Sequence, residues 1–77
     1  MNVNDAVRIR IEELRIQSGL TLSGLADLCG VNFSTMHGIV YGEHKSVTLA
    51  SLQKICDGLE IDLADFFHSE IFYDLDP

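Results

Sequence analysis

The stretch from Thr21 to Gly42, TLSGLADLCGVNFSTMHGIVYG, decides the fold of this 77-residue chain. Its apolar residues recur every three or four positions, which is the spacing of one face of an α-helix. Thr21 and Asn32 are residue types whose side chains cap the first turn of a helix, and Gly30 and Gly42 are the type that most often ends one. The stretch therefore predicts two short helices joined by a tight turn at Gly30.

Each helix of this pair has one apolar face, and the two faces predict a shared core. The inward-facing residues are Leu22, Leu25, Ala26 and Cys29 in the first helix and Met36, Ile39 and Val40 in the second. Two helices joined by a glycine turn of three to four residues form a helix-turn-helix unit. This unit spans about residues 21–42, and its second helix about residues 32–41.

Three further helices with the same spacing flank the unit, one before it and two after it. Their predicted caps are Asn4 or Asp5 for the first helix, Thr48 for the fourth and Asp62 for the short fifth. Their inward-facing residues are Val7, Ile11 and Leu14 in the first helix and Leu49, Leu52, Ile55, Cys56 and Leu59 in the fourth. The pattern predicts an all-α fold, a compact bundle of five short helices over residues 1–68, followed by an acidic and aromatic tail over residues 69–77.

The composition is that of a packed globular domain. Apolar residues make up 47% of the chain and charged residues 22%, and there is one proline, a balance that argues against disorder. A chain this short buries roughly 60–65% of its unfolded surface, which leaves no room for a second domain or a deep catalytic cleft. No apolar run approaches the roughly 20 residues that span a bilayer, and the N-terminus lacks a signal pattern. We therefore expect a cytoplasmic protein that does not contact membranes.

The net charge of −7 is unevenly distributed along the chain. Residues 1–48 carry four Lys or Arg and five Asp or Glu, whereas residues 49–77 carry one and seven. The acidic charge is thus concentrated in the C-terminal part, and the front is nearly neutral. A polyanionic partner is compatible with this distribution if the front faces it.

The sequence contains no arrangement of residues that predicts catalysis or metal binding. His37, His44 and His68 lie far apart, and none has metal-ligand spacing to Cys29 or Cys56. Each cysteine lies within an apolar helical pattern, which favours a small buried hydrophobic side chain over a disulfide. No phosphate-binding glycine loop or nucleophile turn is present. We therefore expect no enzymatic activity, no cofactor and no small-molecule ligand.

The pattern of the helix pair resembles the helix-turn-helix of the Cro and phage-repressor (Xre-type) regulators. The residues that carry the resemblance are Leu20, Thr21, Leu25, Ala26, Cys29, Gly30, Val31, Asn32, Ser34, Thr35, Met36, Ile39 and Gly42. Arg15 occupies the arginine position of the family's first helix, and the run from Thr48 to Phe67 resembles its closing two helices. The resemblance covers about residues 7–67. It implies a lambda-repressor-like fold and a transcriptional regulator, repressor-like, that binds double-stranded DNA.

The resemblance also implies that the second helix of the unit enters the major groove. A helical wheel places four residues on the face that would meet the bases, namely Phe33, Ser34, His37 and Gly38. Ser34 and His37 can donate or accept hydrogen bonds at base edges, and Phe33 can pack on a thymine methyl group. The expected phosphate contacts are Thr21, Ser23, Thr35, Tyr41, His44 and Lys45.

Three features depart from the family pattern. Leu22 stands where the family often has glutamine, and residues 32–42 contain no arginine, lysine or glutamine. Val40 stands where a glutamate commonly pairs with Arg15, so Glu43 becomes the candidate partner. Few cations predict modest DNA affinity with a shallow salt dependence. A second function therefore stays open: a protein-interaction module, such as an antitoxin or accessory subunit, with weak or no DNA binding.

The apolar residues near the C-terminus predict a homodimer. Regulators of this shape place two reading helices one DNA turn apart, roughly 34 Å, and an apolar surface patch often marks the interface that holds them. The predicted interface residues are Phe67, Ile71, Phe72 and Leu75. In the other interpretation, Phe66 and Ile71 simply close the core of a single chain.

Overall fold

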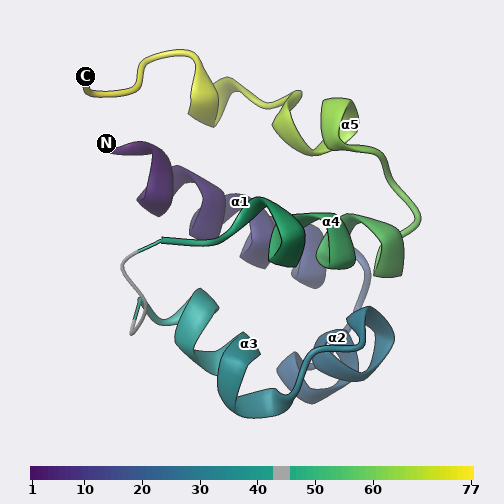
Figure 1. The fold of residues 1–77 in the computed structure, drawn as a ribbon. Coiled ribbons are helices and arrows are strands. Elements are labelled where there is room, and N and C mark those ends of the chain that lie inside the picture. Colours follow the sequence, from purple (N-terminus) through teal and green to yellow (C-terminus); the bar gives the residue numbers. More distant parts are fainter. Residues whose placement is uncertain (43–45) are drawn as a thin grey trace.

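The computed structural model describes residues 1–42 and 46–77, and within these ranges all regular structure is helical. The helices are α1 (Val3–Gln17), α2 (Leu22–Cys29), α3 (Phe33–Val40), α4 (Leu49–Gly58) and α5 (Leu63–Phe67), followed by the short 3₁₀ helix η1 (Glu70–Phe72). Figure 1 shows α1 and α4 across the middle of the molecule, with α2 and α3 below them and α5 above. The predicted all-α bundle of five short helices is confirmed.

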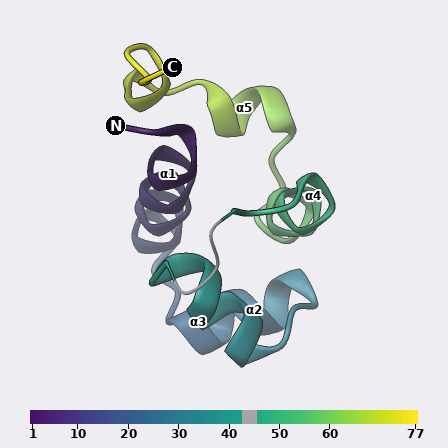
Figure 2. The same ribbon diagram turned by 60° about the vertical axis from the view of Figure 1, so that its left-hand side comes forward.

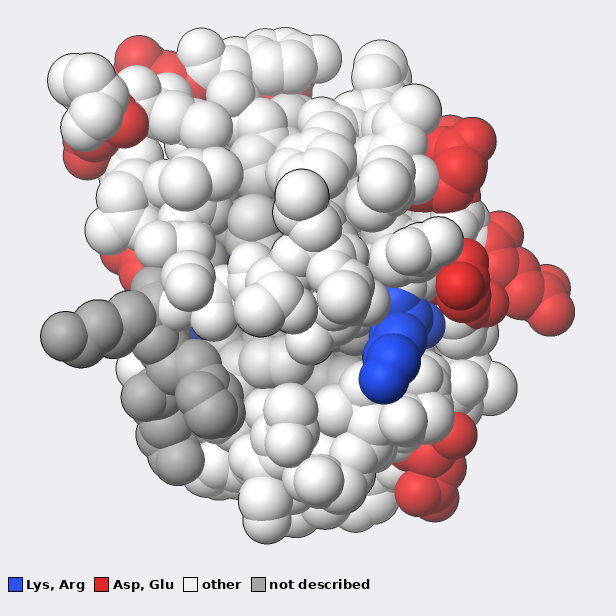
Figure 3. All heavy atoms as spheres, viewed as in Figure 1, with Lys and Arg blue, Asp and Glu red and all other residues white. Residues whose placement is uncertain are grey.

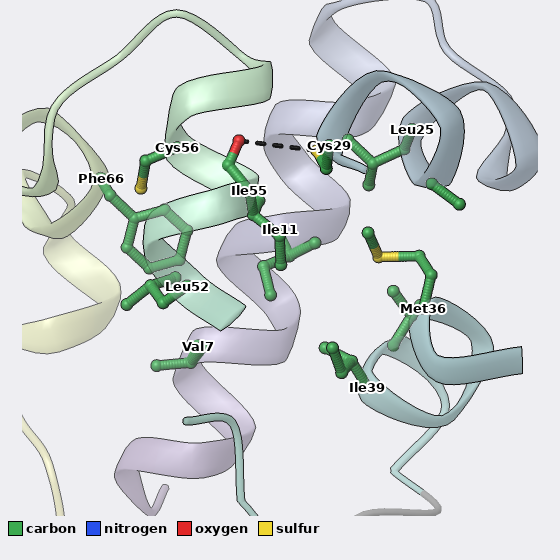
Figure 4. Close-up of a cluster of buried hydrophobic side chains, with 12 residues drawn as sticks. Val7, Ile11, Leu25, Cys29, Met36, Ile39, Leu52, Ile55, Cys56 and Phe66 are labelled. Atoms are coloured by element: carbon green, nitrogen blue, oxygen red, sulfur yellow. Dashed lines mark hydrogen bonds between the residues drawn. The ribbon is translucent and has the colours of Figure 1, made fainter. Parts of the chain in front are cut away.

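One hydrophobic core holds the five helices together. Its fully buried large side chains come from every helix, namely Ile11, Leu25, Met36, Ile55, Cys56 and Phe66 (Figure 4). Of the predicted inward-facing residues, those of the helix-turn-helix unit and of α1 are buried or packed against this core. Leu49 is an exception: it is the first residue of α4, and its side chain is 76% exposed. The prediction that Leu49 faces inward is therefore wrong.

The helix caps follow from local side-chain chemistry. Thr21, Asn32, Thr48 and Asp62 each accept a hydrogen bond from the backbone N–H three residues later, as predicted. Such a bond satisfies one of the N–H groups that the first helical turn leaves without a partner. The cap of α1 differs from the prediction: Asn2, rather than Asn4 or Asp5, takes this role, and its side-chain oxygen accepts from the Asp5 N–H at 2.9 Å.

Helices α1 to α4 are each followed by a residue with positive φ, which turns the chain out of the helix, and after α3 this residue is Gly42 with φ of 76°. Gly19 follows α1 and Gly30 follows α2, both with φ of 69°. After α4 the equivalent residue is Glu60, with φ of 59°. At the ends of α1, α2 and α4, the residue after this turn donates its N–H to a carbonyl five positions back, as Ile61 does to Cys56 at 3.0 Å.

Glu60 is consequently a strained position, because a side chain with a Cβ disfavours this left-handed conformation. We expect Glu60→Gly to raise the free energy of unfolding by about 0.5–1 kcal/mol, through relief of that strain at the end of α4. Chemical denaturation followed by helical circular dichroism measures the change. A loss of stability in this variant would show that the carboxylate makes a compensating interaction.

The two cysteines are buried free thiols within the same hydrophobic core. Cys29 donates a weak hydrogen bond to the Ile55 carbonyl at 3.7 Å, which links α2 to α4. Burial raises the pKa of both the Cys29 and the Cys56 thiol, because a thiolate would lose its hydration there. Within residues 1–42 and 46–77, no three His, Cys, Asp or Glu side chains form a group suited to a metal ion.

The C-terminal segment, residues 69–77, folds back against the start of α1. The chain ends meet there (Figures 1 and 2): the Met1 amino group forms an ion pair with Asp76 at 2.8 Å, and the Asp76 N–H donates to the Met1 carbonyl at 2.9 Å. Phe72 packs against the rings of Phe66 and Phe67, with centroid distances of 6.1 and 4.9 Å. The segment is thus packed onto the domain.

Arg10 joins α1 to α5. Its Nε donates to the Phe66 carbonyl at 2.7 Å and its Nη2 to the Asp65 carbonyl at 3.0 Å. These carbonyls belong to the last turn of α5, where a cation also complements the helix dipole. In the part of the chain that the structure describes, no helix is both long enough and apolar enough to span a membrane.

Candidate nucleic-acid interface

The turn between α2 and α3 fixes how the second helix of the unit is presented. Gly30 takes the left-handed conformation, and the following Val31 N–H donates to the Ala26 carbonyl at 3.0 Å. Asn32 then starts α3 by accepting from the Thr35 N–H at 2.8 Å. The buried side of α3 packs against α2 and α1, so its opposite face is directed away from the bundle.

The predicted base-contacting residues occupy this outward face, with one exception. Phe33 is 49% exposed, Ser34 is exposed, and His37 is half-buried. Gly38 is buried, against the prediction that it shares the exposed face. A glycine has no side chain to project, so its burial is decided by its neighbours rather than by its wheel position.

Aromatic rings follow one another along this face of α3. The centroids of Phe33 and His37 are 5.9 Å apart, and those of His37 and Tyr41 are 4.6 Å apart. Residues four positions apart on a helix lie one above the other, which explains why the three rings are neighbours, each tilted by 40–47° relative to the next. Tyr41, at the end of α3, is 64% exposed. We call Phe33, His37 and Tyr41 the ring row.

The predicted phosphate contacts lie around α2 and α3. Thr21 and Ser23 are exposed at the start of α2, and Thr35 is half-buried in the first turn of α3. The Thr21 hydroxyl accepts from the Gly24 N–H at 3.0 Å. His44 and Lys45, the remaining predicted contacts besides Tyr41, lie outside the described residues.

Sequence reasoning missed a set of hydroxyl groups between α3 and α4. A depression of about 200 Å³ is lined there by Thr35, Ile39, Ser46, Val47, Thr48 and Ser51. The Thr48 and Ser51 side chains are 3.0 Å apart and hydrogen-bonded. The sequence contains the signal, since three hydroxyl residues surround the start of α4, but the helical pattern predicts a role only for Thr48, as the cap.

The described arginines are all engaged by carboxylates of α1. Arg8 pairs with Asp5, Arg10 with Glu13, and Arg15 with Glu12. Arg15 makes two hydrogen bonds to Glu12, at 2.7 and 2.8 Å, and donates a third to the Leu20 carbonyl at 2.7 Å. The Glu12 carboxylate raises the pKa of Arg15. Arg15 therefore anchors the connection between α1 and α2. Its expected partner, Glu43, lies outside the described residues.

The surface over α2 and α3 is largely uncharged. No arginine or lysine occurs between residues 16 and 42, and the only acid there is Asp27. In the view of Figure 3, the lower part of the molecule, formed by α2 and α3, is mostly white, and the basic atoms in view lie above it beside acidic ones. This face therefore offers polar and aromatic contacts with little charge of either sign.

A comparison with known protein families identifies this arrangement of α2, turn and α3. The Cro/C1-type HTH DNA-binding domain matches residues 10–70. The chain belongs to this family. Its α2, turn and α3 are the helix-turn-helix of a Cro/C1-type domain, and Leu22 is half-buried at the start of α2, packed against the core.

Two solved structures are similar to this Cro/C1-type domain. An HTH_3 family transcriptional regulator from Vibrio cholerae is 34% identical with a TM-score of 0.79, over 88% of this chain and 38% of that protein. The prophage Lp1 protein 11 is 30% identical with a TM-score of 0.81, over 97% of this chain and 100% of that one. The chain thus spans just over a third of the Vibrio cholerae protein. Among curated proteins, no relative matches the sequence.

Proposed function

We propose that this chain is a transcriptional regulator that binds double-stranded DNA and reads the major groove with α3. The observation that carries the proposal is the outward face of α3, where Phe33 and Ser34 are exposed at the N-terminal end of the helix. In helix-turn-helix proteins this end of the second helix contacts base edges. A domain bound in this way over a promoter blocks polymerase by occupying the DNA, so we propose a repressor-like role.

The start of α2 supports the proposal by offering phosphate contacts that need no cation. The Thr21 hydroxyl accepts a hydrogen bond from the Gly24 N–H, and the Thr21 carbonyl accepts one from the Leu25 N–H at 2.9 Å. The N–H groups of Leu22 and Ser23 come earlier in the same turn. Groups at this position have no backbone acceptor within the helix. A phosphate oxygen at this position would accept both and would be favoured by the helix dipole.

The first test separates base reading from general attraction to DNA. Selection from a random duplex library with the wild-type protein supplies a specific duplex, and a scrambled duplex of the same composition serves as its control. We expect Ser34→Ala to weaken the specific complex about 5- to 10-fold and to change the scrambled complex little, because a base-edge hydrogen bond is lost. Lys54→Gln, an exposed change on α4, should leave the ratio of the two affinities unchanged. Equal weakening of both complexes by Ser34→Ala would remove Ser34 from the bases.

We also propose that two copies assemble on DNA as a two-fold dimer through the C-terminal part. Phe67 supports this proposal, because its ring is 37% exposed although it lies next to Phe66 and Phe72. Ile71, Phe72 and Leu75 are half-buried within their own chain. Of the predicted interface residues, Phe67 therefore presents the most apolar surface to a second copy.

Sedimentation of wild type and Phe67→Ser, with and without the specific duplex, tests the dimer. We expect the bound wild type to add twice its 8.6 kDa monomer mass to the mass of the duplex, and the variant to add one monomer mass. Leu49→Ser removes a more exposed apolar side chain elsewhere and should not change the mass. A wild-type monomer on DNA, or a Phe67→Ser dimer, would contradict this interface.

A protein-interaction module is the second candidate function, favoured by the absence of arginine and lysine from residues 16–42. Such a module would use the same uncharged face to bind a protein. The library selection distinguishes the two functions, because a module of this kind enriches no duplex over the starting pool.

A further inference from the structure

The outward face of α3, which we call the reading face, lacks the side chains that recognise guanine and adenine by paired hydrogen bonds. Guanine is read most often by arginine or lysine, and adenine by asparagine or glutamine. Residues 16–42 contain no arginine or lysine, and their only amide side chains are Gln17 and Asn32. Gln17 is the last residue of α1. The Asn32 side-chain oxygen already accepts from the Thr35 N–H at 2.8 Å, so it is occupied in holding the helix start.

What this face offers instead is an aromatic ring at the reading end of α3. Phe33 is the first residue of the helix, and half of its surface faces solvent. Its ring belongs to the ring row, with its centroid 5.9 Å from that of His37. An exposed apolar ring at this position gains most from an apolar group on the DNA. In the major groove that group is the C5-methyl of thymine.

We infer that Phe33 selects thymine through its C5-methyl group, so that the duplexes this protein prefers carry T·A pairs beneath the first turn of α3. This inference rests on the proposed function and adds the class of sequence that is bound. Ser34, beside Phe33, supplies a hydrogen bond that suits several bases, which leaves the methyl contact as the main source of discrimination at this point. Removal of water from both the ring and the methyl group stabilises the complex.

Uracil substitution tests the inference, because deoxyuridine lacks only the methyl group and keeps every hydrogen-bonding atom of thymine. Duplexes enriched by the wild-type protein from a random library are resynthesised with deoxyuridine at one thymine at a time, and binding is measured by fluorescence anisotropy. We expect a loss of about 4-fold at one or two positions in each half-site, the effect of one buried methyl group. Flanking thymines should show no change.

Variants of the ring assign the effect to Phe33. Phe33→Ala should bind the thymine and uracil duplexes equally, and Phe33→Leu should keep part of the difference. Tyr73→Ala, which removes a ring that is 72% exposed at the other end of the molecule, should preserve the full 4-fold ratio. Circular dichroism of each variant confirms that the helices are intact.

The possible outcomes separate this inference from the proposed function. If duplexes are enriched but uracil substitution changes nothing in the wild type, methyl recognition is overturned and DNA binding stands. If the wild type shows the ratio and Phe33→Ala keeps it, the assignment of methyl recognition to Phe33 is overturned and DNA binding stands. If no duplex is enriched, the proposed function itself is wrong and the inference falls with it.

Discussion

Replacing Gly58 by alanine is expected to lower the free energy of unfolding by about 2 kcal/mol or more. Gly58 is the last residue of α4, where this helix crosses closest to α2. A Cβ on Gly58 would lie 2.6 Å from the Cys29 Sγ, 2.9 Å from the Cys29 Cα and 3.0 Å from the Leu28 carbonyl oxygen. Two of these atoms belong to the backbone of α2, so the helices themselves must separate to admit the methyl group.

The direction of the effect distinguishes this packing from the local preference of the helix. By helix propensity alone, Gly→Ala stabilises a helix by about 1 kcal/mol. Denaturation with guanidinium chloride, followed by helical circular dichroism, measures the balance, and Gln53→Ala on the exposed side of α4 serves as control. A Gly58→Ala variant as stable as wild type would show that α2 and α4 do not approach this closely. Combination with Cys29→Ala should recover only part of the loss, because the backbone contacts remain.

Much of the fold could be predicted because helix starts and ends are local chemistry. Thr21, Asn32, Thr48 and Asp62 cap as predicted, since a side-chain oxygen three residues before an N–H needs no distant partner. For the first helix the sequence predicts Asn4 or Asp5 as the cap, and neither takes this role. Asn2 caps α1 directly after Met1, and Met1 is held by the C-terminal segment through Asp76, a contact that no local pattern indicates.

The wrong predictions for Leu49 and Gly38 have the same cause, which is that contacts with distant parts of the chain are not visible in a local pattern. A helical wheel assigns a face from spacing, but burial depends on which elements lie opposite. Leu49 has inward spacing but projects from the first turn of α4, where most of its surface meets solvent. Residues 69–77 show no helical period, so the sequence leaves open whether this region closes the core or forms an interface, and it does not indicate that the segment packs onto α1. For the candidate site, the exposure of Phe33 and Ser34 was predictable, whereas the burial of Gly38 was not.

Replacing Ser34 by aspartate is expected to weaken duplex binding at least 100-fold without destabilising the protein. Ser34 is the second residue of α3 and is exposed. A carboxylate in the first turn of a helix interacts favourably with its dipole, so the free energy of unfolding should rise by about 0.3–1 kcal/mol. The same charge on a reading helix inserted between two phosphate backbones is strongly repelled. Fold and DNA binding therefore respond in opposite directions to one substitution.

The matched control adds an equal charge elsewhere. Gln53→Glu changes the net charge by the same amount on the exposed side of α4, so any effect of overall charge on affinity appears in both variants. We expect Gln53→Glu to weaken binding only a few-fold at 0.15 M salt, because charges beyond about 8 Å are largely screened there. Anisotropy titrations over a range of salt concentrations give both affinities. Equal losses in the two variants would mean that α3 does not face the duplex, whereas a selective loss in Ser34→Asp places DNA against the first turn of this helix.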